Sequence, residues 1–324
     1  MGILKLSDIY KPVQEDLDRV EERLKTIGEV ESSWLSELLD YCLKGGGKRL
    51  RPMLVLLSGQ FYKYNLERLL LIAMAVELTH LATLVHDDTI DNSSVRWGRP
   101  TINKLWGTEQ AVLLGDYLFA KAGELTADTE NLRVIRGLAR TLMIISSGEL
   151  AQAYSAFNLE QNRENYMQRI SSKTASLFSF SAESGVVLSQ APEEAIDVLT
   201  EYGYNFGVAF QIVDDILDFI GTEEEMGKPV GSDLTQGTLT LPAMLLVEQH
   251  PEDNPIKRLF QNGLNEEDIN QAIEMVRNSS IIEECFKVAS DYCDKACHRL
   301  NLLPDNESRQ ALIDLADYII RRRR

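Results

Sequence analysis

The chain has 324 residues, of which 44% are apolar and 26% are charged. Asp and Glu number 50 against 33 Lys and Arg, which gives a formal net charge of −17. This composition excludes a disordered, collagen-like or disulfide-rich chain. The acidic balance also argues against a general nucleic-acid-binding protein, because such proteins need a basic surface. It leaves room for a local basic pocket that binds an anionic ligand.

The sequence indicates neither a secretory signal nor a membrane span. The apolar run at residues 69–76 is short, and Glu77 and His80 interrupt its continuation. A membrane-spanning helix needs about 20 apolar residues. The four cysteines are too few for a disulfide framework in a chain of this length. We therefore expect a cytoplasmic protein without a transmembrane anchor.

Apolar residues recur with helical spacing almost throughout, and alternating strand patterns are nearly absent. We predict an all-α fold in which residues 1–324 form a single large domain, built as a helical bundle. Three segments are apolar on nearly all sides: residues 66–88, 133–153 and 202–220. Helices of this kind are surrounded by other helices, so we expect all three to be central.

A glycine-rich basic segment, Gly-Gly-Gly-Lys-Arg-Leu-Arg-Pro, occupies residues 45–52. It is not a P-loop, because the G-x-x-x-x-G-K-[ST] spacing is missing. Glycine lets the backbone approach an anion closely, and Arg can bind a phosphate through two hydrogen bonds. The segment is therefore either a phosphate-binding turn or a helix end followed by a solvated charge cluster.

Two copies of the motif D-D-x-x-D follow apolar helices, at residues 87–91 and 214–218. Positions i and i+4 lie on one face of a helix, about 5–6 Å apart, so the first and last Asp of each motif project together. Neither pair has a basic residue at i±4. Unpaired carboxylates at the end of an apolar helix are unfavourable unless a cation binds them. Two such copies predict a site for Mg²⁺ and a diphosphate rather than two solvated helix ends.

These segments together resemble the trans-prenyl diphosphate synthases, the enzymes that elongate all-trans isoprenoid chains. The resemblance covers residues 45–242 and rests on these pieces, in order: GGGKRLRP, ELTHLATLVHDDTIDNSSVRWGRPT, GDYLFAKA, Lys173-Thr174, FQIVDDILDF and GKPVGSDLTQGTLTLP. It implies an all-α bundle around a deep apolar cavity, usually as a homodimer. It also implies Mg²⁺-dependent, head-to-tail condensation of isopentenyl diphosphate with an allylic diphosphate.

The resemblance assigns roles to the acidic residues. Asp87, Asp91 and Asp214 would ligate the Mg²⁺ ions that hold the allylic diphosphate. Asp88 and Asp218 would orient metal-bound water and neighbouring cations, so we count them as part of the metal site.

The resemblance also implies which residues act on the allylic substrate. Arg96, Lys173 and Lys228 would bind its diphosphate. Thr174 and Gln211 would face the developing carbocation, and we expect them to act in catalysis together with Lys173 and Lys228. The departing pyrophosphate would remove the proton, so no protein base is required.

By the same resemblance, Lys48, Arg51 and His80 would bind the diphosphate of isopentenyl diphosphate. The family usually shows Arg-Arg-Gly after the first acidic motif, and its second Arg helps to bind this substrate. Here Trp97 stands in that place, between Arg96 and Gly98. A hydrogen bond to a charged group contributes about 1.5–3 kcal/mol, so we expect binding weaker by roughly ten- to hundredfold.

Product length depends on the helix that leads into the first motif. Short-chain members of the family place an aromatic ring about one turn before it, as the floor of the cavity. Ala82 and Thr83 occupy this level here. Ala82 would leave the cavity open, which predicts a long-chain product of roughly six to nine isoprene units at about one unit per helical turn.

Three other functions are weighed against a long-chain synthase. A geranylgeranyl-type synthase would differ only in product length. A non-catalytic partner subunit would have lost aspartates of the motifs, which are intact here. An acidic interaction protein would not explain paired motifs with interleaved cations. We therefore expect diphosphate substrates, a homodimer, no nucleic acid, and at most peripheral membrane contact for product release.

Overall fold

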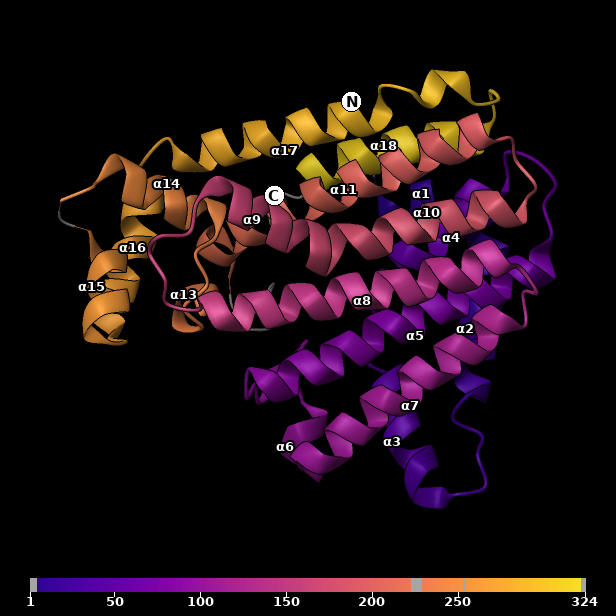
Figure 1. Ribbon diagram of the computed structural model, residues 1–324, viewed down its shortest axis with the longest axis horizontal. Helices are drawn as coiled ribbons and strands as arrows, with labels where there is room; N and C mark the ends of the chain where they lie inside the picture. The colour runs from indigo at the N-terminus through magenta and orange to yellow at the C-terminus, as the bar shows by residue number, and fades with distance from the viewer. Residues whose placement is uncertain (1–4, 223–228, 253, 322–324) are drawn as a thin grey trace.

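The computed structural model describes residues 5–222, 229–252 and 254–321. Within these residues, the only sheet is a two-stranded antiparallel hairpin of β1 (Val95–Arg96) and β2 (Arg99–Pro100). All other regular structure is helical, and the helices pack along one another as a bundle (Figure 1). The predicted all-α fold is confirmed.

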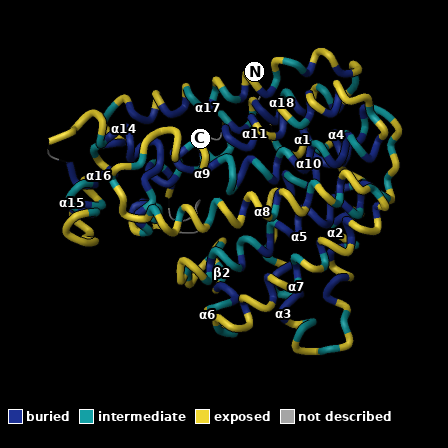
Figure 2. Tube along the Cα trace, viewed as in Figure 1, coloured by how far each residue is buried: buried dark blue, intermediate teal, exposed yellow. Residues whose placement is uncertain are grey.

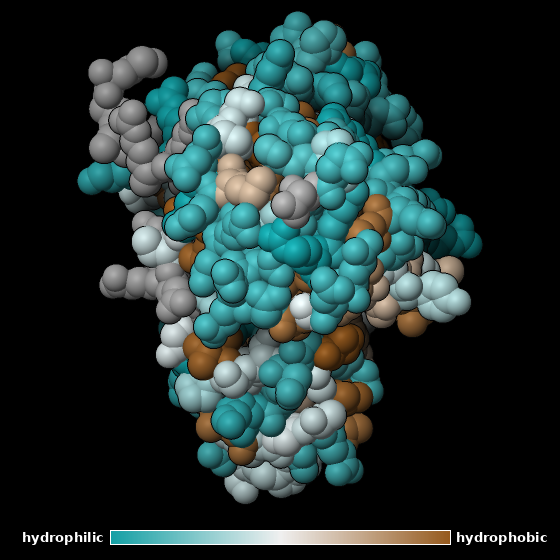
Figure 3. Space-filling view, turned by 90° about the vertical axis from the view of Figure 1, so that its left-hand side faces the viewer, coloured by the Kyte–Doolittle hydropathy of each residue, from teal (hydrophilic) through white to brown (hydrophobic). Residues whose placement is uncertain are grey.

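Shorter helices flank the centre of the bundle at both ends of the chain. The N-terminal group is α1 (Leu6–Ile9), the 3-10 turn η1 (Lys11–Val13), α2 (Gln14–Thr26), α3 (Ser33–Leu43) and α4 (Leu50–Gly59). The C-terminal group is α13 (Ser232–Thr235), α14 (Leu241–Gln249), α15 (Pro255–Asn262), α16 (Glu266–Arg277), α17 (Ile281–Cys297), the 3-10 turn η3 (Leu300–Leu302) and α18 (Glu307–Arg321). The end of the molecule formed by α15 and α16 is largely hydrophilic (Figure 3).

The centre contains the long helices α5 (Leu66–Ile90) and α11 (Glu193–Ile220). They pack against α7 (Thr108–Ala127) and α10 (Ser176–Leu188), and α6 (Ile102–Trp106) leads into α7. Asn65 caps α5 by accepting a hydrogen bond from the backbone N–H of Arg68. The predictions that residues 66–88 and 202–220 form central helices are confirmed.

Two glycines of α11 allow it to approach α10 and the preceding turn closely. A Cβ atom at Gly203 would lie 2.5 Å from the carbonyl oxygen of Phe178, and one at Gly207 would lie 2.6 Å from Cα of Ala175. Any larger side chain would therefore separate the helices. This contact fixes η2 (Ser171–Ala175), a π-helical turn between α9 (Arg163–Ile170) and α10, against α11.

The prediction that residues 133–153 form a central helix is wrong. They belong to α8 (Leu132–Ser155), whose buried residues are only Val134, Leu138, Thr141 and Ile145. Met143, Leu150 and Tyr154 are 70%, 74% and 97% exposed, and Figure 2 shows α8 exposed along much of its length. The apolar residues that suggested burial lie on a face that no other part of the described chain covers.

Helix α5 is long and apolar enough to cross a membrane by length and composition alone. In the structure, 72% of its most apolar 18-residue window is buried inside the protein, as in the core helix of a bundle. Most buried apolar residues of the chain form one connected cluster with α5, which extends from Ile9 to Ile319.

Candidate active site at the ends of two central helices

The first acidic motif lies where α5 leaves the core. Asp88 is buried, and its carboxylate oxygens accept hydrogen bonds from Nε of Arg96 at 2.8 and 2.9 Å. Burial raises the pKa of Asp88, and the ion pair with Arg96 opposes this rise. Asp87 is half-buried and Asp91 is exposed one turn further on. The motif therefore combines one buried carboxylate, which pairs with Arg96, and two carboxylates that are partly or fully exposed.

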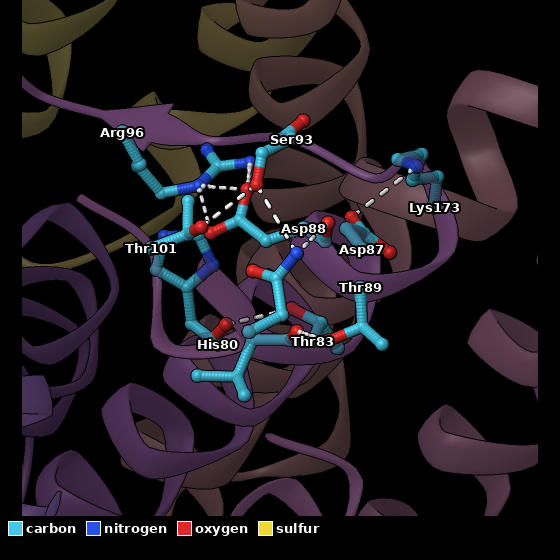
Figure 4. Close-up of polar contacts among 11 residues, drawn as sticks. His80, Thr83, Asp87, Asp88, Thr89, Ser93, Arg96, Thr101 and Lys173 are labelled. Atoms are coloured by element: carbon cyan, nitrogen blue, oxygen red, sulfur yellow. Dashed lines mark hydrogen bonds and ion pairs between the residues drawn. The ribbon is translucent and has the colours of Figure 1, made fainter. Parts of the chain in front are cut away.

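Lys173 approaches the same helix end from η2. Its Nζ lies 3.3 Å from Oδ2 of Asp87 and 2.8 Å from Oε1 of Glu149. Figure 4 shows Lys173 and Arg96 on opposite sides of the motif. Burial lowers the pKa of Lys173, but the two carboxylates outweigh burial and raise it. Lys173 is therefore a permanent positive charge beside Asp87.

Glu149 of α8 is a site residue that the sequence analysis missed. It is half-buried, burial raises its pKa, and Lys173 opposes this rise. The available signal was its isolation, because it is the only charged residue among positions 142–153. Nothing in local spacing connects it to Lys173, which lies on a different helix.

The second acidic motif ends α11, and its first and last aspartates have different surroundings. Asp214 is half-buried and lies in the electrostatic range of Arg51. Asp218 is buried and accepts hydrogen bonds from Oγ of Ser232 at 2.9 Å and from the backbone N–H of Asp233 at 3.1 Å. Asp218 therefore ties the end of α11 to the segment that begins α13.

The middle aspartate, Asp215, belongs to a buried hydrogen-bond network. Its two oxygens accept from the hydroxyl of Tyr166 and from Nε2 of Gln211, both at 2.8 Å. The hydroxyl of Thr174 donates to Oε1 of Gln211 at 2.6 Å. Burial raises the pKa of Asp215 to about 7. Tyr166 had no sequence signal, because it reaches Asp215 from another helix.

The π-helical turn η2 contacts both helices that carry the acidic motifs. Lys173 contacts Asp87 at the end of α5, and the next residue, Thr174, contacts Gln211 on α11. Gln211 lies within one turn of Asp214 on the same helix. The C-terminal parts of α5 and α11 therefore both contact one short turn, and that turn supplies both a cation and a hydroxyl.

The glycine-rich segment supplies a further cation at the start of α4. Arg51 lies over the ring of Phe178, 4.4 Å from its centroid, and its buried Nε has no hydrogen-bond partner. Burial lowers the pKa of Arg51 to about 10. An unpaired buried donor is unfavourable by about 1–3 kcal/mol, and a bound anion would relieve this. Lys48 is exposed beside it, while burial and the charge of Arg51 hold the pKa of His80 well below its ordinary value.

Arg49 has a structural task within the same segment. It adopts a left-handed backbone conformation with φ 47° and is buried. Its guanidinium pairs with Glu21 of α2 and, at 2.6 Å, with Glu77 of α5. Arg49 therefore anchors the segment to α2 and α5.

The acidic residues suit a metal that is shared with a substrate. Within the described residues, no three His, Cys, Asp or Glu are grouped closely enough to hold a metal ion. Mg²⁺ fits such a site, because it keeps several waters and takes one or two carboxylates together with substrate phosphates. Of the predicted site residues, Lys228 lies outside the described part of the chain.

Comparison with known proteins identifies the family. The polyprenyl synthetase family model matches residues 32–276. The chain belongs to the polyprenyl synthetase family. It is 40% identical to heptaprenyl diphosphate synthase component 2 of Geobacillus stearothermophilus, over 98% of this chain and 99% of that protein. It is 33% identical to the chloroplastic solanesyl diphosphate synthase 2 of Arabidopsis thaliana, over 98% of this chain and 78% of that protein.

Solved structures of polyprenyl synthases agree with this family. A polyprenyl synthase from Caulobacter crescentus, complexed with calcium and isoprenyl diphosphate, has a TM-score of 0.94 at 33% identity and covers both chains fully. The heptaprenyl diphosphate synthase of Staphylococcus aureus has a TM-score of 0.91 at 35% identity, over 99% of each chain. The predicted family, the prenyltransferase class and the long-chain type are confirmed.

Three residues are predicted to affect substrate binding or product length: Trp97, Ala82 and Thr83. Trp97 has φ 50° in the turn between β1 and β2, and its ring lies 3.3 Å from the position that a Cβ of Gly45 would occupy. It therefore covers the backbone of the glycine-rich segment. Ala82 is 0% exposed, and the hydroxyl of Thr83 donates to the carbonyl of His80.

Proposed function

We propose that the protein is a Mg²⁺-dependent polyprenyl diphosphate synthase that adds isopentenyl diphosphate head-to-tail to an allylic diphosphate. Its product is a chain of roughly six to nine isoprene units, at about one unit per helical turn of depth. The observation that carries this proposal is that η2 contacts both helices that bear the acidic motifs, through Lys173 and Asp87 on one side and Thr174 and Gln211 on the other.

The diphosphate of the allylic substrate is held between cations of the protein and the metal. Asp87, Asp91 and Asp214 would ligate Mg²⁺, which stabilises the leaving pyrophosphate when bound. Lys173 and Arg96 supply fixed positive charge beside it, and both are held in place by carboxylates. Preoriented charges of this kind stabilise the transition state for leaving-group departure.

The carbocation that remains is stabilised by neutral dipoles. Thr174 and Gln211 carry oxygen atoms next to the cationic site, and their mutual hydrogen bond fixes both side chains. Arg51 and Lys48 hold the diphosphate of isopentenyl diphosphate, with neutral His80 as a further partner. The double bond of that substrate attacks the cation, and the released pyrophosphate removes the proton. The apolar walls of the bundle exclude water.

The protein acts as one domain and as a homodimer in this proposal. The connected core from Ile9 to Ile319 supports a single domain. The apolar face of α7 and α8, defined by Val112, Leu113, Met143, Leu150 and Tyr154, is 41% to 97% exposed and would be covered by the second copy. The relatives named component 2 make a different second subunit the alternative occupant. The protein works in the cytoplasm and contacts membranes only peripherally.

Product analysis tests the proposal directly. Purified protein is incubated with farnesyl diphosphate and labelled isopentenyl diphosphate, with and without Mg²⁺. We expect pyrophosphate release and long-chain products only with the metal, and their loss in Asp87→Asn. A product of four isoprene units would favour the geranylgeranyl-type synthase. The proposed function is refuted if the purified protein makes no product, either by itself or together with a second subunit.

A further inference from the structure

The network behind Gln211 explains why a carboxylate without a basic hydrogen-bond partner is kept in the core. Asp215 is 3% exposed, and within the described residues its side-chain hydrogen bonds come from the hydroxyl of Tyr166 and the amide of Gln211. A buried carboxylate of this kind is unfavourable unless something else requires it. Neither partner carries a positive charge. We therefore attribute the presence of Asp215 to the orientation that it gives these two side chains.

The carboxylate imposes one orientation on the amide of Gln211. A glutamine side chain can place either its NH₂ group or its oxygen at a given position. Asp215 accepts from Nε2, so Oε1 must point to the other side, where the hydroxyl of Thr174 donates to it. When Asp215 is ionised, a flipped amide would bring Oε1 against a carboxylate oxygen. The second lone pair of Oε1 remains for the reacting substrate.

We propose that Tyr166 is a positioning residue for the prenyl transfer reaction. Its ring is 0% exposed, and its hydroxyl donates to the carboxylate oxygen that Gln211 does not use. This bond fixes the rotation of the carboxylate of Asp215, which fixes the amide of Gln211. Tyr166 therefore keeps an oxygen, rather than an NH₂ group, next to the developing carbocation. The inference rests on the proposed role of Gln211 in the active site.

The chain offers a matched control for a test of this role. Tyr202 is also 0% exposed, and its hydroxyl donates to the backbone carbonyl of Leu312 at 2.7 Å, outside the network. Tyr166→Phe and Tyr202→Phe each remove one buried hydroxyl, so they should lower thermal stability by similar amounts. Only Tyr166→Phe should lower kcat, by about tenfold, with both Michaelis constants within about twofold.

A double-mutant cycle and an activity-independent readout complete the test. In the Gln211→Ala background, Tyr166→Phe should cause no further loss of kcat. In NMR spectra of protein with ¹⁵N-labelled glutamine, the side-chain NH₂ signal of Gln211 is assigned by its absence in Gln211→Ala. The hydrogens of this NH₂ group should exchange with solvent faster in Tyr166→Phe but not in Tyr202→Phe. Unchanged exchange, or additive losses of kcat, would overturn the inference. Inactive wild-type protein would refute the proposed function, and the exchange measurement would still decide the role of Tyr166.

Discussion

Ala82 lies five residues before Asp87 on α5 and is completely buried. In the proposed reaction the growing chain passes this level of the helix, so a phenylalanine here would block it. We predict that Ala82→Phe shifts the products to short chains, while Ala82→Ser leaves them long. Chromatographic sizing of the products measures this. The same long products from Ala82→Phe would show that the floor of the cavity lies elsewhere.

Trp97 covers Gly45 with an apolar ring where the family usually has a second arginine. We predict that Trp97→Arg lowers the Michaelis constant for isopentenyl diphosphate roughly ten- to hundredfold, because a charged hydrogen bond contributes about 1.5–3 kcal/mol. Trp97→Phe keeps an aromatic ring and should leave this constant unchanged. Steady-state kinetics with a saturating allylic substrate measures both. An unchanged constant in Trp97→Arg would contradict our explanation of Trp97.

At the scale of elements, Arg49 connects the glycine-rich segment to α2 and α5. It is 8% exposed, and it pairs with Glu77, which is 3% exposed. Breaking a buried ion pair by removing one partner destabilises a protein by about 3–5 kcal/mol, so we predict this loss for Arg49→Ala. Arg23→Ala breaks the exposed ion pair with Glu67 and should change stability by only about 0–1 kcal/mol. Urea unfolding measures both, and equal effects would argue against the anchor.

Apolar patterns in the sequence predict the helices correctly, but they do not predict what surrounds each helix. The apolar segments at 66–88 and 202–220 are central because other helices of the chain surround them. The segment at 133–153 has a similar pattern but covers only one side of the bundle. An apolar helix face indicates that the face is buried against protein. It does not indicate whether the same chain or another chain buries it.

The site was predictable to the extent that its residues are local in sequence. The spacing of Asp87 and Asp91 predicts a metal site even when the fold is not known. Glu149 gains its role only because α8 packs beside η2, and Tyr166 gains its role only because α9 packs beside α11. Such contacts follow from tertiary packing, which no local pattern records. Arg49 and Arg51 show the same limit, since neighbours of equal charge have different tasks.

At the scale of the whole molecule, the apolar face of α7 and α8 predicts assembly. Leu150 is 74% exposed on α8. If the proposed homodimer uses this face, Leu150→Asp should give monomers in light scattering, because a buried, unpaired charge is unfavourable in an apolar interface. Leu264→Asp, at a 50% exposed position between α15 and α16, should leave the dimer intact. If the wild-type protein is a monomer, the homodimer is contradicted and a different second subunit is favoured.

In the proposed function, the two acidic motifs on separate helices jointly bind one metal–diphosphate group. Calorimetric titration with an unreactive thio analogue of an allylic diphosphate tests it most directly. We predict tight binding only with Mg²⁺, with at least about tenfold weaker binding in Asp87→Asn and in Asp214→Asn. Binding that is independent of Mg²⁺, or that is unaffected by one of the two substitutions, would contradict joint binding by the two motifs.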